Sequence, residues 1–275
     1  MPGSAPNDWD SSLRPFLEQE AGDPWRAYCD QLHEQMLDEW LPGDRVRRVL
    51  KTDLFDEAAG AGVVATLSSR ADQVHAFDVS GPVAAQASKR NPAARVTSAD
   101  VRRLPYRDGS FDLIFSNSTL DHFPTEGDVV QAVAELHRVL RAGGRLWISF
   151  DNLANPVIAL RAALPIGWLN RIGLVPYFVG KTVTRGGLSR LLTASGFTVE
   201  RLGYAMHVPR VLAVPICARL RGRPEAVARW HQTFRFFEGL ERWPVRRLTG
   251  HFVVALATKP DASKLGGRGS SNRSS

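Results

Sequence analysis

The sequence predicts an α/β fold: a doubly wound, seven-stranded, mostly parallel sheet with an N-terminal helix and helical cap insertions. Short apolar runs alternate with helical patterns along the chain, which is the order typical of a parallel sheet. Two of these runs, residues 73–78 and the run before Asp100, are followed by a carboxylate at the point where ligands meet such a sheet. The 275 residues, 44% hydrophobic and 23% charged, suit one globular domain with an elaboration.

Seven apolar runs are the expected strands. They span residues 48–55, 73–78, 95–97, 111–115, 145–150, a run from Phe197, and residues 251–258. Helical patterns separate them, and the clearest cover residues 63–70, 82–90, 128–141 and 184–197. Gly143 and Gly144 are expected to end the third of these helices and Gly196 the fourth, because glycine readily adopts the backbone conformation that closes a helix.

One more helix is predicted ahead of the sheet. Asp23 followed by Pro24 is a typical helix start, with a capping side chain and then proline at the first position. Apolar side chains then recur at helical spacing up to Pro42 and Gly43, namely Trp25, Tyr28, Leu32, Met36 and Trp40. We interpret this stripe as core packing, and a role over a ligand is the alternative. Residues 1–44 form the expected N-terminal segment, and residues 259–275, Gly/Ser-rich and basic, an expected disordered tail.

Two sequence blocks resemble a known family. Residues 100–114 contain D-x-x-x-L-P-x-x-D-G-S-F-D-L-I, and residues 139–149 read VLRAGGRLWIS. In their order and spacing these blocks resemble the class I S-adenosylmethionine-dependent methyltransferases, particularly the group that includes quinone and small-molecule methylases. The resemblance covers residues 49–150. It implies a Rossmann-like methyltransferase domain over residues 45–258, cap insertions at about 152–185 and 208–240, and S-adenosyl-L-methionine as cofactor.

The resemblance also implies cofactor contacts in the loops that follow the strands. Asp78 stands where nucleotide-binding sheets place a carboxylate on the ribose hydroxyls. Asp100 stands where the resembling family binds the adenine amino group, with the Val101 backbone beside the ring. Asn117 begins the loop that lies over the sulfonium in this family. The alternative for Asp78 and Asp100 is that they cap helices.

The loop after the first strand departs from the family pattern. The family has an acidic residue and then a glycine-rich turn there, whereas residues 51–62 read KTDLFDEAAGAG. A carboxylate such as Asp53 or Glu57 can meet the ammonium of the cofactor, and Gly60 and Gly62 can allow close approach of the backbone. The alternative is a long loop with solvated acids.

The site loop, residues 117–124, contains the candidate catalytic residues. A sulfonium is already an activated methyl donor, so the rate comes from positioning and exclusion of water, and a base is needed only for an oxygen or carbon acid. His122 is the leading base because histidine titrates near neutrality, and Asp121 can orient it or serve instead. Packing or cofactor contact is the alternative role for His122.

The acceptor is expected to be a small or amphipathic molecule, methylated on oxygen, carbon or nitrogen. In the resembling family the substrate is read by the region after the fifth strand, where Trp168 and Tyr177 lie among proline breaks. Tyr204 and His207, from the second cap, are further candidates. These aromatic residues also suit a packed cap, and the sequence does not separate the two roles.

The distribution of charge suggests partners. The chain carries +7 overall, but residues 181–275 hold 17 Lys and Arg against 5 Asp and Glu, while residues 1–180 hold 18 against 23. Arginines beside an apolar wall suit an anionic or amphipathic acceptor, including one presented at an anionic membrane surface. They are not grouped with aromatics on a strand, so nucleic acid is not expected as a partner. No apolar run is long enough to span a bilayer.

Further features restrict the class of protein. Cys29 and Cys217 show neither a disulfide framework nor metal-ligand spacing, so no metal is expected. The first residues lack the pattern of a signal peptide, which predicts a cytoplasmic protein, with peripheral contact at the inner membrane surface as a variant. A nicotinamide-dependent oxidoreductase would need G-x-G-x-x-G after the first strand, and that motif is absent. A methyltransferase fold that only binds or regulates is the other alternative, favoured by the altered glycine loop.

Overall fold

The computed structural model describes residues 10, 23–41, 43, 45–165, 171 and 180–261. In these ranges seven strands form one sheet in the order β3-β2-β1-β4-β5-β7-β6. The strands are β1 (Val46–Thr52), β2 (Ala71–Asp78), β3 (Arg95–Ser98), β4 (Phe111–Ser116), β5 (Leu140–Asp151), β6 (Thr198–Ala205) and β7 (Phe252–Thr258). Strands β1 to β5 are paired in parallel, and β7 is antiparallel to both β5 and β6. The predicted fold class is confirmed.

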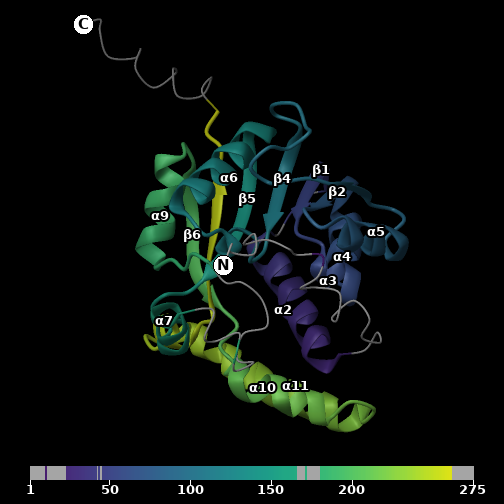
Figure 1. Ribbon diagram of the computed structural model, residues 1–275, viewed down its shortest axis with the longest axis vertical. Coiled ribbons are helices and arrows are strands. Elements are labelled where there is room, and N and C mark those ends of the chain that lie inside the picture. Colours follow the sequence, from purple (N-terminus) through teal and green to yellow (C-terminus); the bar gives the residue numbers. More distant parts are fainter. Residues whose placement is uncertain are drawn as a thin grey trace, which may run out of the picture.

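Helices cover both faces of the sheet (Figure 1). None of the helices in the described ranges is both long and apolar enough to cross a membrane. The described helices are α2 (Pro24–Trp40), α3 (Phe55–Ala59), α4 (Val64–Arg70), α5 (Gly81–Arg90), η1 (Leu120–His122), α6 (Glu126–Val139), α7 (Pro156–Ala163), α9 (Arg185–Ala194), α10 (Arg210–Arg219), α11 (Pro224–Glu238), η2 (Gly239–Arg242) and α12 (Arg246–Thr249).

The sheet separates two hydrophobic cores, because successive side chains of a strand point to opposite faces. In β7, Val254 and Leu256 belong to one core and Val253 and Ala255 to the other. The first core is closed by α2, α4, α5, α10 and α11, and the second by α6 and α9. Burial on both faces explains why the strand sequences read as continuous apolar runs instead of alternating ones.

One predicted helix end was wrong. Residues Gly143 and Gly144 do not terminate α6, which ends at Val139 and passes directly into β5. A distant residue causes the early end: the ammonium of Lys259 donates to the carbonyl oxygens of His137 and Leu140 at 2.7 and 2.8 Å. The helix carbonyls are thus satisfied without a glycine cap.

The first strand also ends earlier than predicted. It stops at Thr52, and the next residue, Asp53, has φ = 63°, which turns the chain out of the sheet. Leu54 and Phe55, expected in the strand, therefore lie in the turn and in α3. Strand β5 begins earlier than predicted, at Leu140 instead of Arg145. The start of α2 is as predicted, and Asp23 Oδ1 there accepts from the Trp25 amide at 2.9 Å.

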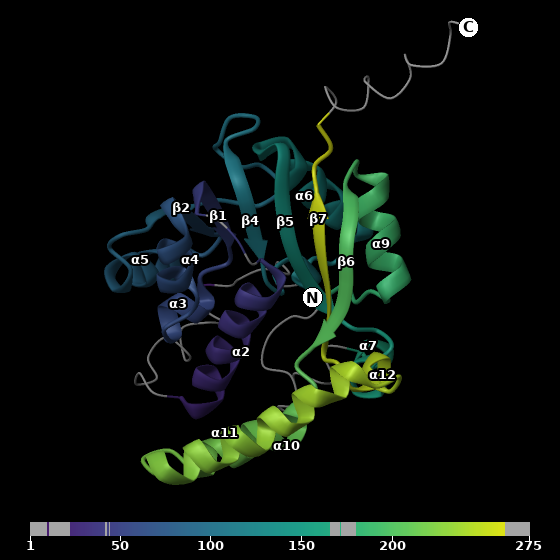
Figure 2. The ribbon, with the colours of Figure 1, turned by 180° about the vertical axis from the view of Figure 1, so that it is seen from behind.

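The carboxyl ends of the parallel strands are covered by helices that are distant in sequence. Helix α2 crosses this end of the sheet, and the α10–α11 hairpin extends below it (Figure 2). Gly203 of β6 lies against the Trp40 ring of α2, and the Arg201 guanidinium stacks over the same ring, 4.1 Å from its centroid. The N-terminal helix is thereby attached to the far edge of the sheet.

Replacing Gly203 with alanine should loosen this attachment. The new Cβ would lie 2.9 Å from Trp40 Cζ2, so the helix must shift, and we expect the free energy of unfolding to fall by about 1–3 kcal/mol in urea titrations. Gly127→Ala is the matched control, since its Cβ would meet nothing closer than 3.7 Å and alanine favours helix. Equal stability of the two variants would show that α2 does not depend on this contact.

Candidate cofactor and acceptor site

A buried ion pair holds the loop after β1. Lys51 Nζ lies 2.8 Å from Glu57 Oε2, both side chains are almost completely buried, and the same ammonium donates to the carbonyl oxygen of Asp53. Glu57 Oε1 accepts from the Val63 amide at 2.9 Å, next to the start of α4. Burial opposes the charge of Lys51, but the neighbouring carboxylates outweigh burial and raise its pKa. The partner of the Glu57 carboxylate is therefore the buried ammonium of Lys51.

The two loop glycines lie under acidic side chains. A Cβ at Gly62, where φ is +60°, would come within 2.3 Å of Glu57 Oε1, so glycine is required for this packing. The Gly62 amide donates to Asp30 Oδ2 of α2 at 3.2 Å, and a Cβ at Gly60 would lie 3.4 Å from the same oxygen. Burial raises the pKa of Asp30 to about 7. In this chain side chains, more than bare glycines, determine the shape of the loop.

Asp53 and Asp78 form an acidic pair at the ends of β1 and β2. Asp78 accepts from the amides of Leu54 and Ser80, each at 2.8 Å, and so ties the two strand-end loops together. Burial, and then the charge of Asp78, raises the pKa of Asp53 to about 7. Asp10 adds a third carboxylate through a 2.6 Å hydrogen bond from the Ser80 hydroxyl. The site is thus rich in negative charge, and Lys51 is already paired.

Asp100 and Val101 follow β3 as predicted but are shaped by an arginine. The Arg102 guanidinium lies 2.6 Å from Asp100 Oδ2 and 2.6 Å from Asp128 Oδ1, which connects this turn to α6. Although burial opposes it, Arg102 lowers the pKa of Asp100. Val101 is buried in the core on the α6 face.

Asn117 joins a hydrogen-bonded network at the ends of β1, β4 and β5. Its Oδ1 accepts from the Ser149 hydroxyl at 2.8 Å, and its Nδ2 lies 3.2 Å from His33 Nε2 of α2. Burial lowers the pKa of His33 to about 4, so this ring is neutral. Thr52 Oγ1 is 2.6 Å from Thr119 Oγ1 in the same layer. Helix α2 therefore contributes polar side chains at the strand ends.

Asp121, the acidic residue of the predicted catalytic loop, is buried. Its Oδ2 accepts from the Ser118 hydroxyl at 2.7 Å, whereas its Oδ1 has no hydrogen-bond partner among the described residues. Burial raises its pKa to about 6, against the opposing charge of His122. His122 itself is half-buried at the end of η1. The two predicted residues are adjacent in the loop after β4, at the same sheet end as Asn117.

A charged cluster lies beside this loop, at the ends of β5 and β7. Asp151 Oδ2 is 2.5 Å from Arg161 of α7, and Asp151 Oδ1 is 3.3 Å from His251 Nε2, which also lies 2.8 Å from Arg210 of α10. Although burial opposes the charge of Asp151, His251 and Arg161 hold its pKa well below the usual range. Burial and then Arg210 lower the pKa of His251 to about 4.

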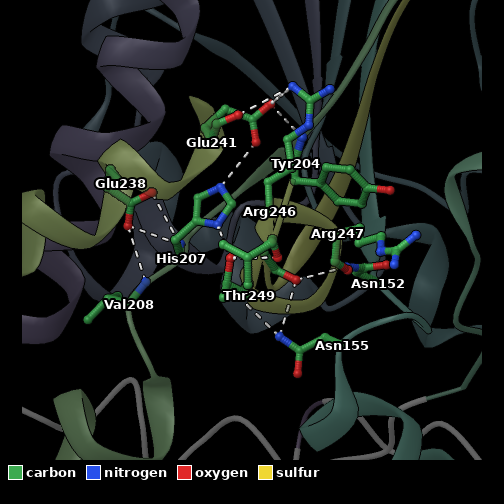
Figure 3. Close-up of polar contacts among 12 residues, drawn as sticks. Asn152, Asn155, Tyr204, His207, Val208, Glu238, Glu241, Arg246, Arg247 and Thr249 are labelled. Carbon is green, nitrogen blue, oxygen red and sulfur yellow. Dashed lines mark hydrogen bonds and ion pairs between the residues drawn. The ribbon is translucent and has the colours of Figure 1, made fainter. Parts of the chain in front are cut away.

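Two candidates were assigned to the second cap: Tyr204 lies in β6, and His207 follows the end of that strand. Figure 3 shows the His207 ring between Thr249 and Glu241, at 2.7 Å from Nδ1 and 3.2 Å from Nε2. The His207 amide donates to Glu238 at 3.0 Å, while Asn152 and Asn155 donate to the carbonyl oxygen of Gly250. Tyr204 packs against Gly250. This cluster joins β6, α11 and α12.

Two of the predicted substrate residues, Trp168 and Tyr177, lie outside the described residues. Their neighbour Gly180 is described: its amide donates to the Asp121 carbonyl oxygen at 2.8 Å, and a Cβ there would collide with the Phe123 backbone. Gly180 therefore lies directly against the loop that carries Asp121 and His122.

The sequence did not single out Lys51, Asp30, His33 or Ser149 for this site. For Asp30 and His33 a signal existed, because they are polar side chains three residues apart on the otherwise apolar buried side of the helix. Lys51 stands where the family usually has an acid, and this substitution, followed six residues later by Glu57, was the available signal for an ion pair.

Comparison with known proteins identifies the domain. Residues 55–148, from α3 into β5, match a family model described as a methyltransferase domain. This part of the chain is therefore similar to a methyltransferase domain. The methyltransferase domain has a structural likeness in the N-methyltransferase NodS of Bradyrhizobium japonicum, a crystal structure in complex with S-adenosyl-L-homocysteine, with a TM-score of 0.55 and 15% identity over 93% of this chain and 100% of that one. At 15% identity, this likeness shows only that the two proteins share a fold.

Curated relatives match part of this chain. A malonyl-[acyl-carrier protein] O-methyltransferase of Pseudescherichia vulneris is 37% identical over 83 residues, 30% of this chain and 31% of that protein. A probable tRNA methyltransferase 9B of Mus musculus is 35% identical over 111 residues, 38% of this chain and 24% of that protein. The chain thus spans less than a third of either relative, and their names state different acceptors.

S-adenosylmethionine is the cofactor that the sequence resemblance implies, and part of the site fits it. The sulfonium and amino groups of the cofactor are cationic, and the acidic group of Asp53, Asp78 and Asp10 offers them carboxylates whose charge Lys51 offsets only in part. Asp78 keeps lone pairs for the ribose hydroxyls beyond its two amide contacts. The glycine loop fits less well, because Glu57 occupies the space beside Gly62.

Breaking the Lys51–Glu57 pair should destabilise the domain. Glu57→Gln leaves a buried ammonium without its counter-charge, which costs about 3–5 kcal/mol of unfolding free energy in urea titrations. The double variant Lys51→Met with Glu57→Gln removes both charges and keeps the acceptor for the Val63 amide, so it should recover most of this loss. Additive losses in the double variant would show that the two side chains do not interact.

Proposed function

We propose that this protein transfers a methyl group from S-adenosylmethionine to a small or amphipathic acceptor. The observation that carries the proposal is the methyltransferase domain match over residues 55–148, with acids at the ends of its strands that suit a cationic cofactor. The relatives do not fix the acceptor or the methylated atom, because each matches only part of this chain and their names state different acceptors.

The residues of the chain have separate roles in this proposal. The cofactor supplies an activated methyl group, so the protein must orient the acceptor and exclude water. Asp78 holds the ribose, Asp53 faces the cationic end, and Asp100 with Val101 lies at the adenine. Helix α2, which carries Asp30 and His33 over the loop ends, covers the site.

Proton removal is assigned to the loop after β4. The unpartnered Oδ1 of Asp121 and its raised pKa near 6 suit a carboxylate that accepts a proton or orients His122. His122 is placed one residue further along the same turn, less buried than Asp121. The base is needed only if the acceptor is an oxygen or carbon acid.

The acceptor is placed on the side of α7 and α10. Arg161 and Arg210 converge there on Asp151 and His251, and the surrounding cap is apolar and rich in arginine. An amphipathic acid or phosphate suits such a wall, since a guanidinium binds either group bidentately. We further propose that the protein works in the cytoplasm and contacts an anionic membrane peripherally.

A second candidate function is a fold that binds the cofactor without turnover. The specific observation in its favour is Glu57, which fills the glycine loop and is paired with Lys51. Turnover assays separate this function from the first.

Cofactor binding tests the common part of both functions. Isothermal titration with S-adenosylhomocysteine should show binding, and Asp78→Ala and Asp100→Ala should each weaken it by about 1–3 kcal/mol through loss of charge-assisted hydrogen bonds. Asp72→Ala, an exposed acid at the start of β2, is the matched control. Unchanged affinity in both site variants would refute the placement of the cofactor.

Turnover tests the methyl transfer itself. Host extract with labelled methyl donor identifies the product, after which His122→Ala should lower turnover about 10²–10⁴-fold and change cofactor affinity little. Because burial raises the pKa of Asp121 to about 6, turnover should fall below about pH 6 as this carboxylate is protonated, and Asp121→Asn should remove that fall.

Two results would contradict these roles. Loss of cofactor affinity without loss of turnover per bound enzyme would make His122 a binding or packing residue. Cofactor binding without a labelled product in any fraction would favour the binding function.

A further inference from the structure

Helix α10 is apolar on all sides, yet only one side is covered. Ala213 and Cys217 are buried against α2, whereas Val211 and Leu212 are 60% and 61% exposed and Val214 is also exposed. A helix that is hydrophobic all round normally lies in a core or in lipid. The uncovered side of α10 is therefore unusual for a surface in contact with water.

Further apolar side chains are exposed around the same end of the molecule. Phe236 of α11 is 81% exposed and Trp243, after η2, is 65% exposed. Val157 and Leu160 of α7 are exposed as well. Figure 2 shows these elements, α7, α10, α11 and α12, grouped at the end of the sheet where the parallel strands finish. This is the end at which the acceptor is placed.

Arginines surround this apolar surface. The hairpin carries five exposed arginines, which we call the hairpin arginines: Arg219, Arg221, Arg223, Arg229 and Arg235. Within the described ranges one ion pair involves this group, Arg221 with Asp23 at 3.2 Å. The acids of the hairpin are Glu225 and Glu238, and Glu238 is engaged by the Tyr28 hydroxyl at 2.9 Å and the His207 amide. The hairpin surface is therefore strongly cationic.

A groove lies between the hairpin and the start of α2. Its volume is about 540 Å³, and Arg223 and Arg235 line it together with Gln31, His231 and apolar residues such as Val227. The arginine side chains of this groove suit the phosphate of a lipid, and its apolar side chains suit the upper part of an acyl chain.

We propose that the α10–α11 hairpin docks the protein on an anionic bilayer, with the exposed side of α10 in the interface and the hairpin arginines at the lipid phosphates. The docking itself does not depend on the proposed function. Only its purpose, the delivery of an amphipathic acceptor, rests on that function. Exposed apolar side chains flanked by arginines are typical of helices that lie in a membrane interface. An acidic protein would satisfy the arginines but not Val211, Leu212 and Phe236. A second copy would bring like charges together.

Vesicle sedimentation tests the docking without cofactor or acceptor. The wild-type chain should bind phosphatidylcholine vesicles that contain phosphatidylglycerol, bind pure phosphatidylcholine vesicles far less, and lose affinity as salt rises. The triple variant Arg219→Gln, Arg223→Gln, Arg229→Gln should bind about 100-fold more weakly, because each arginine near an anionic surface contributes several-fold. Val211→Glu with Val214→Glu should weaken binding about 10-fold or more, since these side chains would no longer enter the interface.

Matched controls separate the hairpin from general charge and hydrophobicity. Arg185→Gln with Arg190→Gln removes two exposed arginines of α9, and Val130→Glu replaces an exposed apolar side chain of α6. Both controls should bind vesicles like the wild type. If they lose as much affinity as the hairpin variants, or if the wild type shows no preference for anionic vesicles, the proposal is wrong.

Calorimetry with S-adenosylhomocysteine distinguishes failure of the docking from failure of the proposed function. The hairpin variants should keep the wild-type cofactor affinity, because none of the substituted residues contacts the acidic pair. Vesicle binding without cofactor binding would refute the methyltransferase proposal and leave the docking surface intact. Salt-sensitive self-association, seen by sedimentation velocity in place of vesicle binding, would refute the membrane as occupant.

Discussion

The buried pair of Lys51 and Glu57 is the constraint on which the cofactor end of the molecule depends. An ammonium and a carboxylate taken out of water are tolerable only together, so the chain must bring the end of β1 and the end of α3 into contact. That contact fixes the turn at Asp53, the glycine at position 62 and the start of α4. In this loop the buried ion pair determines the backbone conformation, whereas in a glycine-rich loop the conformational freedom of glycine allows it.

Much of the fold was predictable because it depends on local patterns. Apolar runs between helical patterns are enough to place strands that are buried on both faces, and Asp23 with Pro24 is enough to start α2. The errors at the ends of α6 and β1 have different causes. The end of α6 is set by Lys259, far along the chain, which leaves no signal in the neighbouring residues. The end of β1 is set by the next residue, Asp53, whose positive φ was not predicted from its residue type.

The candidate site shows the same division. Asp78 and Asp121 were found because position relative to a strand end is written in the sequence. The contacts of Asp30, His33 and Asp151 were not, because each partner comes from another helix or strand: Gly62 for Asp30, Asn117 for His33, and Arg161 with His251 for Asp151. The contacts of His207 with Thr249 and Glu241 were likewise not predictable, because both partners come from segments distant in sequence.

Glu238 gives the arrangement one more consequence. Its carboxylate accepts from the Tyr28 hydroxyl of α2 and from the amides of His207 and Val208, so a single side chain joins the hairpin, the end of β6 and the helix that carries Asp30. Any change in the tilt of the hairpin must therefore alter the position of α2 above the loop after β1. Lipid and cofactor would then be linked ligands, and by thermodynamic reciprocity each would change the affinity of the protein for the other by the same factor.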